Sequence, residues 1–128
     1  MTKHFSKTHE WALNSKVGIT EWAQKELGEI VYVDLPEIGS KVKAGDVLCV
    51  VETTKAATDI YTPFSGEIKS VNVELNDKPH LLNQDPENLG WIAKLAFEEP
   101  EQYEKEIAAL LSETAYQKLI GIPEPLLS

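Results

Sequence analysis

The feature that most constrains the fold is the close spacing of turn-forming residues along the first hundred positions. Gly, Pro, Asn and Asp recur at short intervals and leave between them short segments rich in Val, Ile and Tyr. Segments of this kind are typical of β-strands, and many short strands predict an antiparallel sandwich or barrel. The expected strands cover residues 11–13, 16–19, 30–33, 47–52, 58–61, 67–73 and 91–97.

One short helix is expected among these strands, over residues 20–28. Thr20 can cap its first turn, Ala23 and Leu27 share a face, and Gly28 can end it.

The pattern becomes helical after Pro100. Apolar residues follow at i, i+4, i+7 and i+8, and glutamates lie between them, so we expect an amphipathic helix with the Glu-rich stretch 98–106 on its solvent face. The apolar positions are Tyr103, Ile107, Leu110 and Leu111. A second helical segment is predicted over 112–120, ending at Gly121.

The domain organisation that follows is a single unit. No low-complexity linker separates the strand-rich part, about 3–98, from the helical part, about 100–121, so the helices are expected to pack on the sheets within one domain spanning 1–128. The tail 122–128 is expected to be loose, and we assign it no function.

Composition excludes several function classes. The formal net charge is −9 and all twelve basic residues are lysines, which disfavours nucleic-acid binding because no arginine fork is available and the negative field repels a polyanion. No apolar run is long enough to span a bilayer and no secretory signal is visible, so we expect a cytoplasmic protein without a membrane partner. Cys49, alone within an apolar run, is expected to be a buried and inert thiol.

Lys55 stands out by position. Glycine turns at 42–46 and 64–67 bracket it almost evenly, and strands that fold back on each other would put residues 53–56 at an exposed hairpin tip. Small neighbours, Thr54 and Ala56, would let this tip enter a narrow active site of a modifying enzyme. Ile68 and Val71 are out of step with strict alternation, which a β-bulge could absorb.

The segment around this lysine resembles a known family. Residues 52–56 read Glu-Thr-Thr-Lys-Ala, and with Asp-Ile-Tyr-Thr-Pro-Phe-Ser-Gly-Glu at 59–67 they are similar to the lipoylation segment of glycine cleavage H proteins. The flanks favour this family over the shorter lipoyl domains of 2-oxoacid dehydrogenases. The flanking matches are Thr8-His9-Glu10-Trp11, 17–20, 23–24, 27–37, 81–86 and Gly90-Trp91, and the resemblance covers roughly 3–120.

The sequence departs from the family pattern at two places. Thr53-Thr54 replaces the usual Ser-Val beside the lysine, and 87–89 reads Glu-Asn-Leu where a tyrosine and glycine are common. These departures bear on the complete reaction cycle more than on the carrier role.

The resemblance implies a mainly β fold, a flattened antiparallel sandwich or hybrid barrel like that of lipoyl domains, with a short helix near 20–28 and C-terminal helices. It implies lipoate attached covalently to Lys55 as N6-lipoyllysine by a lipoate ligase or lipoyl transferase. The arm would carry the aminomethyl group of glycine from glycine decarboxylase (P protein) to aminomethyltransferase (T protein), and electrons to dihydrolipoyl dehydrogenase (L protein).

The resemblance also places the family's cleft residues at Thr8, Glu10 and Asp59. A carboxylate there could pair with the protonated amine of the loaded arm, although Glu10 and Asp59 could equally be solvated or turn-capping carboxylates. We expect a monomer in the cytoplasm, or in the mitochondrial matrix of a eukaryote after removal of a transit peptide.

Other readings remain open at this stage. An H-like protein can serve in lipoate relay to other complexes, a biotin carrier has a similar shape but usually has methionines beside its lysine, and an interaction module would never be acylated. No enzyme motif is present, so we expect a carrier without catalysis of its own. His4, His9 and His80 lack metal-ligand spacing, and no metal site is expected; His9 is expected to be packed or hydrogen-bonded, and the three tryptophans to be packing residues.

Overall fold

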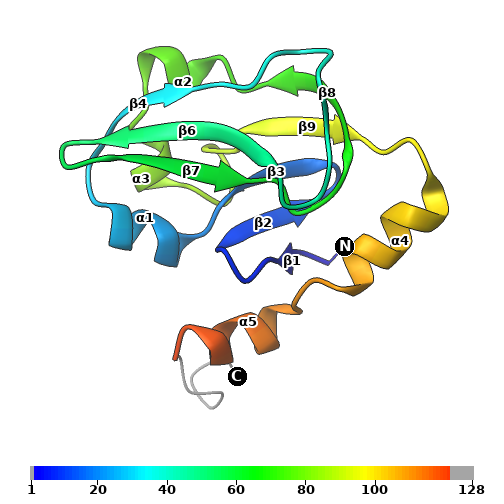
Figure 1. Ribbon diagram of the computed structural model, residues 1–128. Helices are drawn as coiled ribbons and strands as arrows, with labels where there is room; N and C mark the ends of the chain where they lie inside the picture. Colours follow the sequence, from blue (N-terminus) through cyan, green and yellow to red (C-terminus); the bar gives the residue numbers. More distant parts are fainter. Residues whose placement is uncertain (1, 122–128) are drawn as a thin grey trace.

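The computed structural model describes residues 2–121, so the expected loose tail at 122–128 lies outside the described residues. Its strands form two antiparallel sheets that face each other as a sandwich (Figure 1), which confirms the expected mainly β architecture. The larger sheet has the order β1-β2-β3-β9-β8-β5 and the smaller one β4-β6-β7.

The strand bounds lie close to the predicted ones. The larger sheet contains β1 (His4–Phe5), β2 (Glu10–Leu13), β3 (Lys16–Ile19), β5 (Lys41–Val42), β8 (Gly66–Val71) and β9 (Ala93–Ala96). The smaller sheet contains β4 (Ile30–Asp34), β6 (Val47–Thr53) and β7 (Ala57–Tyr61). The two-residue strands β1 and β5 were not predicted, because two residues are too few to show alternation.

A register shift between Ile68 and Ser70 interrupts the pairing of β8 with β9. A bulge therefore does absorb the irregular alternation of Ile68 and Val71, and it lets Ile68 point fully into the core while Val71 is only half-buried. The strand ends at Val71, two residues earlier than expected, and Val73 is exposed.

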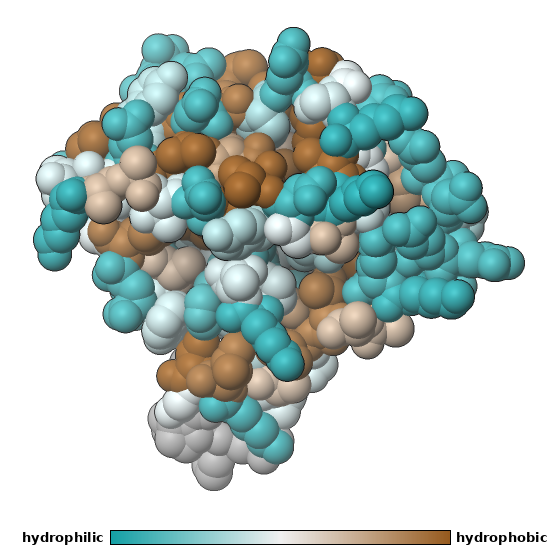
Figure 2. Space-filling view, in the orientation of Figure 1, coloured by the Kyte–Doolittle hydropathy of each residue, from teal (hydrophilic) through white to brown (hydrophobic). Residues whose placement is uncertain are grey.

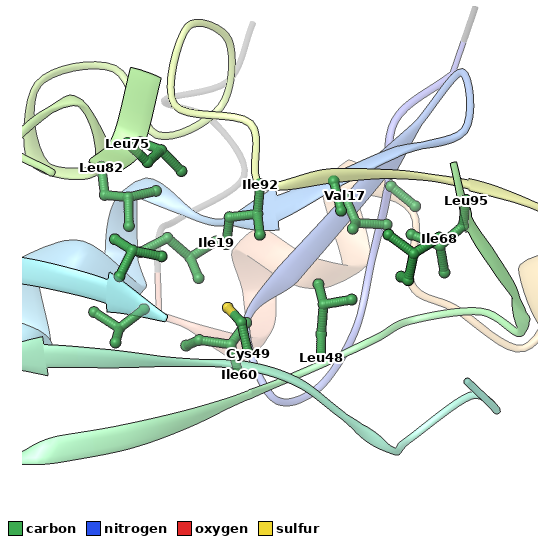
Figure 3. Close-up of a cluster of buried hydrophobic side chains, with 14 of the residues drawn as sticks. Val17, Ile19, Leu48, Cys49, Ile60, Ile68, Leu75, Leu82, Ile92 and Leu95 are labelled. Atoms are coloured by element: carbon green, nitrogen blue, oxygen red, sulfur yellow. The ribbon is translucent and has the colours of Figure 1, made fainter. Parts of the chain in front are cut away.

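The core lies between the two sheets. Apolar side chains from both inner faces point toward one another (Figure 3), and Val17, Ile19 and Ile92 from one side meet Leu48, Cys49 and Ile60 from the other. Burial raises the pKa of the Cys49 thiol to about 12, with the charges of Asp34 and Glu10 acting in the same direction. The expectation of a buried thiol is therefore confirmed.

Helix α1 (Glu21–Leu27) forms as predicted. The Thr20 hydroxyl accepts a hydrogen bond from the N–H of Ala23 at its start, and Gly28 ends it with φ +83°, a backbone conformation that favours glycine. Two four-residue helices, α2 (Glu74–Asp77) and α3 (Leu81–Gln84), were not predicted. They are single turns that bury Leu75 and Leu82, too short for helical periodicity to appear in the sequence.

The C-terminal helices correct one prediction and confirm another. Helix α4 (Pro100–Ala108) packs Tyr103 and Ile107 on the core as expected, but it ends before Leu110 and Leu111. Leu111 instead exchanges two backbone hydrogen bonds with Phe5, of 2.9 and 2.7 Å. These bonds to β1 take the place of one more helical turn. Helix α5 (Glu113–Leu119) follows with Ser112 as its cap and ends before Gly121, as predicted.

The prediction that the glutamates of α4 face solvent is wrong for Glu106. Its carboxylate accepts hydrogen bonds from both the N–H and the hydroxyl of Ser65, at 2.8 and 2.6 Å. Burial alone would raise the pKa of Glu106, but these hydrogen bonds, together with one from Gln102, outweigh it and lower the pKa. Glu106 therefore fastens α4 to the turn before β8.

No helix within residues 2–121 has the length and apolar character needed to cross a membrane.

The burial of Cys49 predicts its chemical behaviour. With a pKa of about 12, only about one thiol in ten thousand would be ionised at pH 8. A disulfide reagent at pH 8 should therefore leave the folded protein unlabelled for hours and label one thiol per chain at once in guanidinium. Rapid labelling of the native protein, with its circular dichroism unchanged, would contradict the packing described for β6.

Candidate functional site

The predicted hairpin tip exists and carries Lys55 at its end. Strands β6 and β7 pair from Val47 opposite Tyr61 to Glu52 opposite Ala57, and the hairpin projects from one end of the sandwich (Figure 1). The N–H of Thr53 donates to the carbonyl of Ala56 at 2.9 Å, which closes the turn around Thr54 and Lys55. The whole stretch from Thr54 to Ala57 is exposed. Hydrophilic groups project from the molecular surface at this end (Figure 2).

The hydroxyl of Thr53 holds this turn from inside. Its oxygen accepts hydrogen bonds from the N–H groups of Lys55 and Ala56, both at 3.1 Å, and the hydroxyl donates to the carbonyl of Ala56 at 3.2 Å. The next N–H, that of Thr54, donates to the carbonyl of Glu29 at 3.3 Å. Each backbone N–H from Thr53 to Ala56 thus has a partner, so the tip is ordered while the side chain of Lys55 points into solvent.

Asn83 supports the hairpin tip indirectly, through the neighbouring segment that contains Glu29, and the sequence did not reveal this role. Its amide nitrogen donates to the carbonyl of Gly28 at 2.8 Å, and its amide oxygen accepts from the N–H of Ile30 at 3.0 Å. Asn83 on α3 therefore fixes the corner between α1 and β4, and this corner contains Glu29, the residue that receives the Thr54 hydrogen bond.

The geometry at Lys55 fits the attachment of an acyl group. The side chain is exposed and small residues flank it. Among residues 2–121 its ammonium group has no carboxylate within ion-pair distance. A modifying enzyme could reach the amine without first breaking an interaction.

A cleft of about 170 Å³ lies beside the outer edge of β7, between that strand, α1 and the loop before β2. The three residues singled out in the sequence, Thr8, Glu10 and Asp59, all contribute to its wall. The sequence did not identify the remaining lining residues, half of which come from α1: His9, Ile19, Trp22, Ala23, Glu26, Leu27, Thr58 and Ile60.

Within this cleft Glu10 is a buried carboxylate, only 2% exposed. One oxygen accepts hydrogen bonds from the hydroxyls of Ser6, at 2.7 Å, and Thr8, and the other accepts from the N–H of Tyr61 at 3.2 Å. Burial raises the pKa of Glu10, and these hydrogen bonds oppose the shift. The reading of Glu10 as a solvated carboxylate is therefore wrong: Glu10 ties β2 of one sheet to β7 of the other. Asp59 is exposed on the same strand, as the solvated alternative expected.

The cleft combines apolar walls with carboxylates. An apolar cavity of about 150 Å³ can hold one benzene-sized group, so this cleft has room for the end of a flexible arm and not for its whole length. Glu10, Glu26 and Asp59 contribute carboxylates to the lining, which contains no lysine. Such a site favours a small cationic group on an apolar stem.

The histidine and the tryptophans behave as packing residues, as expected. His9 stacks on Trp22 with ring centroids 4.1 Å apart and bonds to the hydroxyl of Tyr116 at 2.9 Å. Desolvation lowers the pKa of His9, although the negative charge of Glu26 opposes the shift. Trp11 is buried, and its indole N–H donates to the carbonyl of Pro86 at 3.0 Å, whereas Trp91 is half-buried.

The departure from the family pattern at Glu87 has a local explanation. Its carboxylate accepts a hydrogen bond from the N–H of Glu21 at 2.9 Å and pairs with the ammonium of Lys3 at 3.1 Å. Glu87 therefore occupies the N-terminal end of α1, where a negative charge is favourable, and helps to fix the helix that forms one wall of the cleft.

Comparisons with known proteins agree on one family. The sequence model of the family described as "Glycine cleavage H-protein" matches residues 3–121. The chain is 48% identical over 120 residues to the glycine cleavage system H protein of Thermotoga maritima, covering 91% of this chain and 94% of the relative. It is 50% identical over 121 residues to that of Klebsiella pneumoniae, covering 91% of each.

A solved structure agrees with these sequences. The crystal structure of a glycine cleavage system H protein from Mycobacterium marinum is similar with a TM-score of 0.78 and 32% identity, covering 94% of this chain and 97% of that one.

The hydrogen bonds of Glu10 predict its effect on stability. Glu10→Ala removes the acceptor of three hydrogen bonds and leaves the N–H of Tyr61 without its partner, so we expect it to lower the free energy of unfolding by about 1–3 kcal/mol at pH 7. Because the folded-state pKa of Glu10 is raised from 4.5, the ionised form weakens folding, and this cost disappears as pH falls through the folded pKa.

The gap between wild type and Glu10→Ala in urea melts should therefore widen from pH 7 toward pH 4.5. The control is Asp59→Ala, which removes an exposed carboxylate from the same cleft and should change stability little. A gap that narrows on acidification would mean that Glu10 stabilises the fold mainly as an anion.

Proposed function

This chain belongs to the glycine cleavage H-protein family, and from that premise we propose that Lys55 is the residue that bears the lipoyl group. As a member it is a lipoyl carrier of the glycine cleavage system. The observation that supports Lys55 most is the hairpin tip, where each backbone N–H from Thr53 to Ala56 is bonded and the exposed lysine side chain stands between small residues.

The chemistry of a carrier explains why such a tip is useful. A lipoyl group supplies a disulfide that can be opened, loaded and closed again. The chain's own contribution is to hold the attachment point at a fixed height above the body, so that each partner enzyme meets the arm in the same position. Thr53 provides this rigidity through its side-chain hydroxyl, and Glu29 provides it through its backbone carbonyl.

We propose that the cleft lined by Thr8, Glu10 and Asp59 receives the end of the arm between visits to partners. The apolar residues of its walls would shelter a hydrocarbon stem, and Asp59 would pair with a cationic cargo. Glu10 contributes less to such pairing, since both of its oxygens already accept hydrogen bonds. Its part would be to hold β2 and β7 together so that the cleft keeps its shape.

As a carrier of the glycine cleavage system, the protein has three kinds of partner enzyme: glycine decarboxylase, aminomethyltransferase and dihydrolipoyl dehydrogenase. We propose in addition that a lipoate ligase or lipoyl transferase modifies Lys55, that the protein works as a monomer, and that it has no catalytic activity of its own. The strand-rich core and the C-terminal helices would act as one domain, because Tyr103 and Ile107 of α4 pack on the core. The net charge of −9 would draw the carrier toward basic entrances of these enzymes.

The assignment of Lys55 is tested by intact mass. Protein incubated with lipoate, ATP and a lipoate ligase should gain the mass of one lipoyl group, and Lys55→Arg should abolish the gain. The matched control is Lys43→Arg, which changes an exposed lysine in another turn and should leave the gain complete. Full modification of Lys55→Arg, or modification mapped to another lysine, would overturn the assignment.

A further inference from the structure

We propose that Tyr116 on α5 is a positioning residue whose hydroxyl holds two walls of the cleft in place, so that the C-terminal helix acts as its latch. The inference rests on the proposed function, because it takes this cleft to be the resting place of the arm. Tyr116 itself does not line the cleft, and its effect would be transmitted through His9 and Thr20.

The hydroxyl of Tyr116 bonds to two residues that belong to different walls. Its oxygen lies 2.9 Å from Nδ1 of His9, in the loop before β2, and 2.7 Å from the hydroxyl of Thr20, at the start of α1. The sequence separations are 107 and 96 residues. A single oxygen atom thereby joins α5 to both sides of the cleft.

The wall formed by His9 requires such support. His9 has a backbone φ of +74°, in the left-handed region that residues other than glycine rarely adopt. Its carbonyl accepts a hydrogen bond from the N–H of Thr20 at 3.1 Å, and its ring stacks on Trp22. Since this backbone conformation is costly, the side-chain bond to Tyr116 helps to keep it.

The wall formed by α1 depends on the same hydroxyl through Thr20. Thr20 is fully buried, and its oxygen caps the helix by accepting the N–H of Ala23 at 3.1 Å. A hydroxyl can accept that bond and still donate its own proton to Tyr116, which in turn can donate to the unprotonated Nδ1 of His9. The hydrogen bonds then run from Ala23 through Thr20 and Tyr116 to His9, and each donor in this series has one acceptor.

Helix α5 has other attachments that do not involve this hydroxyl. The ring of Tyr116 stacks on Phe5 with centroids 4.6 Å apart, and the Leu111–Phe5 bridge holds the chain just before the helix (Figure 1). Replacing Tyr116 by phenylalanine should therefore leave the helix in place and remove only the contact with the cleft walls. This separates a role in packing from a role in positioning.

The first experiment uses the unlipoylated protein and amide hydrogen exchange measured by NMR. Tyr116→Phe should speed exchange at Thr20 and Ala23 about fivefold, as expected for the loss of one buried hydrogen bond, while amides in β6 and β8 keep their rates. The control is Tyr103→Phe on α4, whose ring packs on Phe64 and Phe97 away from the cleft. Rates at Thr20 and Ala23 that stay within twofold of wild type would overturn the proposal.

The same site offers a second pair of variants. Thr20→Ser keeps a hydroxyl that can bond to Tyr116 and should match wild type at His9 and Trp22, whereas Thr20→Val removes it and should change the NMR signals of both rings. If Thr20→Val leaves the His9 imidazole signals where they are in the wild type, the hydroxyl chain does not position His9 and the proposal fails.

The third experiment measures retention of cargo on the lipoylated protein. After loading with glycine by the P protein and removal of that enzyme, Tyr116→Phe should release its cargo to water about fivefold faster than wild type or Tyr103→Phe, because looser walls admit water. Equal release rates in all three proteins would overturn the latch. A wild-type protein that gains no lipoyl group would instead refute the proposed function. The hydrogen-exchange experiment would still test the hydrogen bonds of the Tyr116 hydroxyl, because it uses unlipoylated protein.

Discussion

A tight turn with all its backbone N–H groups bonded is the constraint on which the carrier depends. Thr53 closes it from within and Glu29 anchors it from outside, so the Lys55 side chain extends from a fixed base. A flexible loop would offer the same amine over a wide volume, and each partner would have to order it at an entropic cost. Because the turn is already ordered in the folded protein, no partner has to meet this entropic cost on binding.

The cleft beside β7 depends on a different kind of contact, in which residues distant in sequence meet. Glu10 reaches across from β2 to the N–H of Tyr61 on β7, and Glu87 fixes the start of α1. Glu10 thus joins two elements that line the cleft, and Glu87 holds one of its walls from a segment outside it. The cleft is thus a product of the whole sandwich, whereas the hairpin is a nearly local structure.

This difference explains what the sequence could predict. The strands, the capped helix α1 and the hairpin tip follow from local patterns: turn-forming residues between segments rich in Val, Ile and Tyr, Thr20 and Gly28 at the helix ends, and glycine turns on both sides of Lys55. The resemblance named Thr8, Glu10 and Asp59, which do line one cleft. Patterns could not tell that Glu10 is buried, that Asn83 supports the corner below the tip, or that Leu111 leaves α4 to pair with Phe5. Those outcomes depend on partners 51 to 106 residues away.

Backbone dynamics of the unmodified protein test the central claim most directly. The 15N order parameter of the Lys55 amide should be close to about 0.85, the value of rigid backbone, and it should fall in Thr53→Val but not in Thr53→Ser. A wild-type value below about 0.6, typical of a flexible loop, would contradict the account, because Lys55 would then have no fixed base.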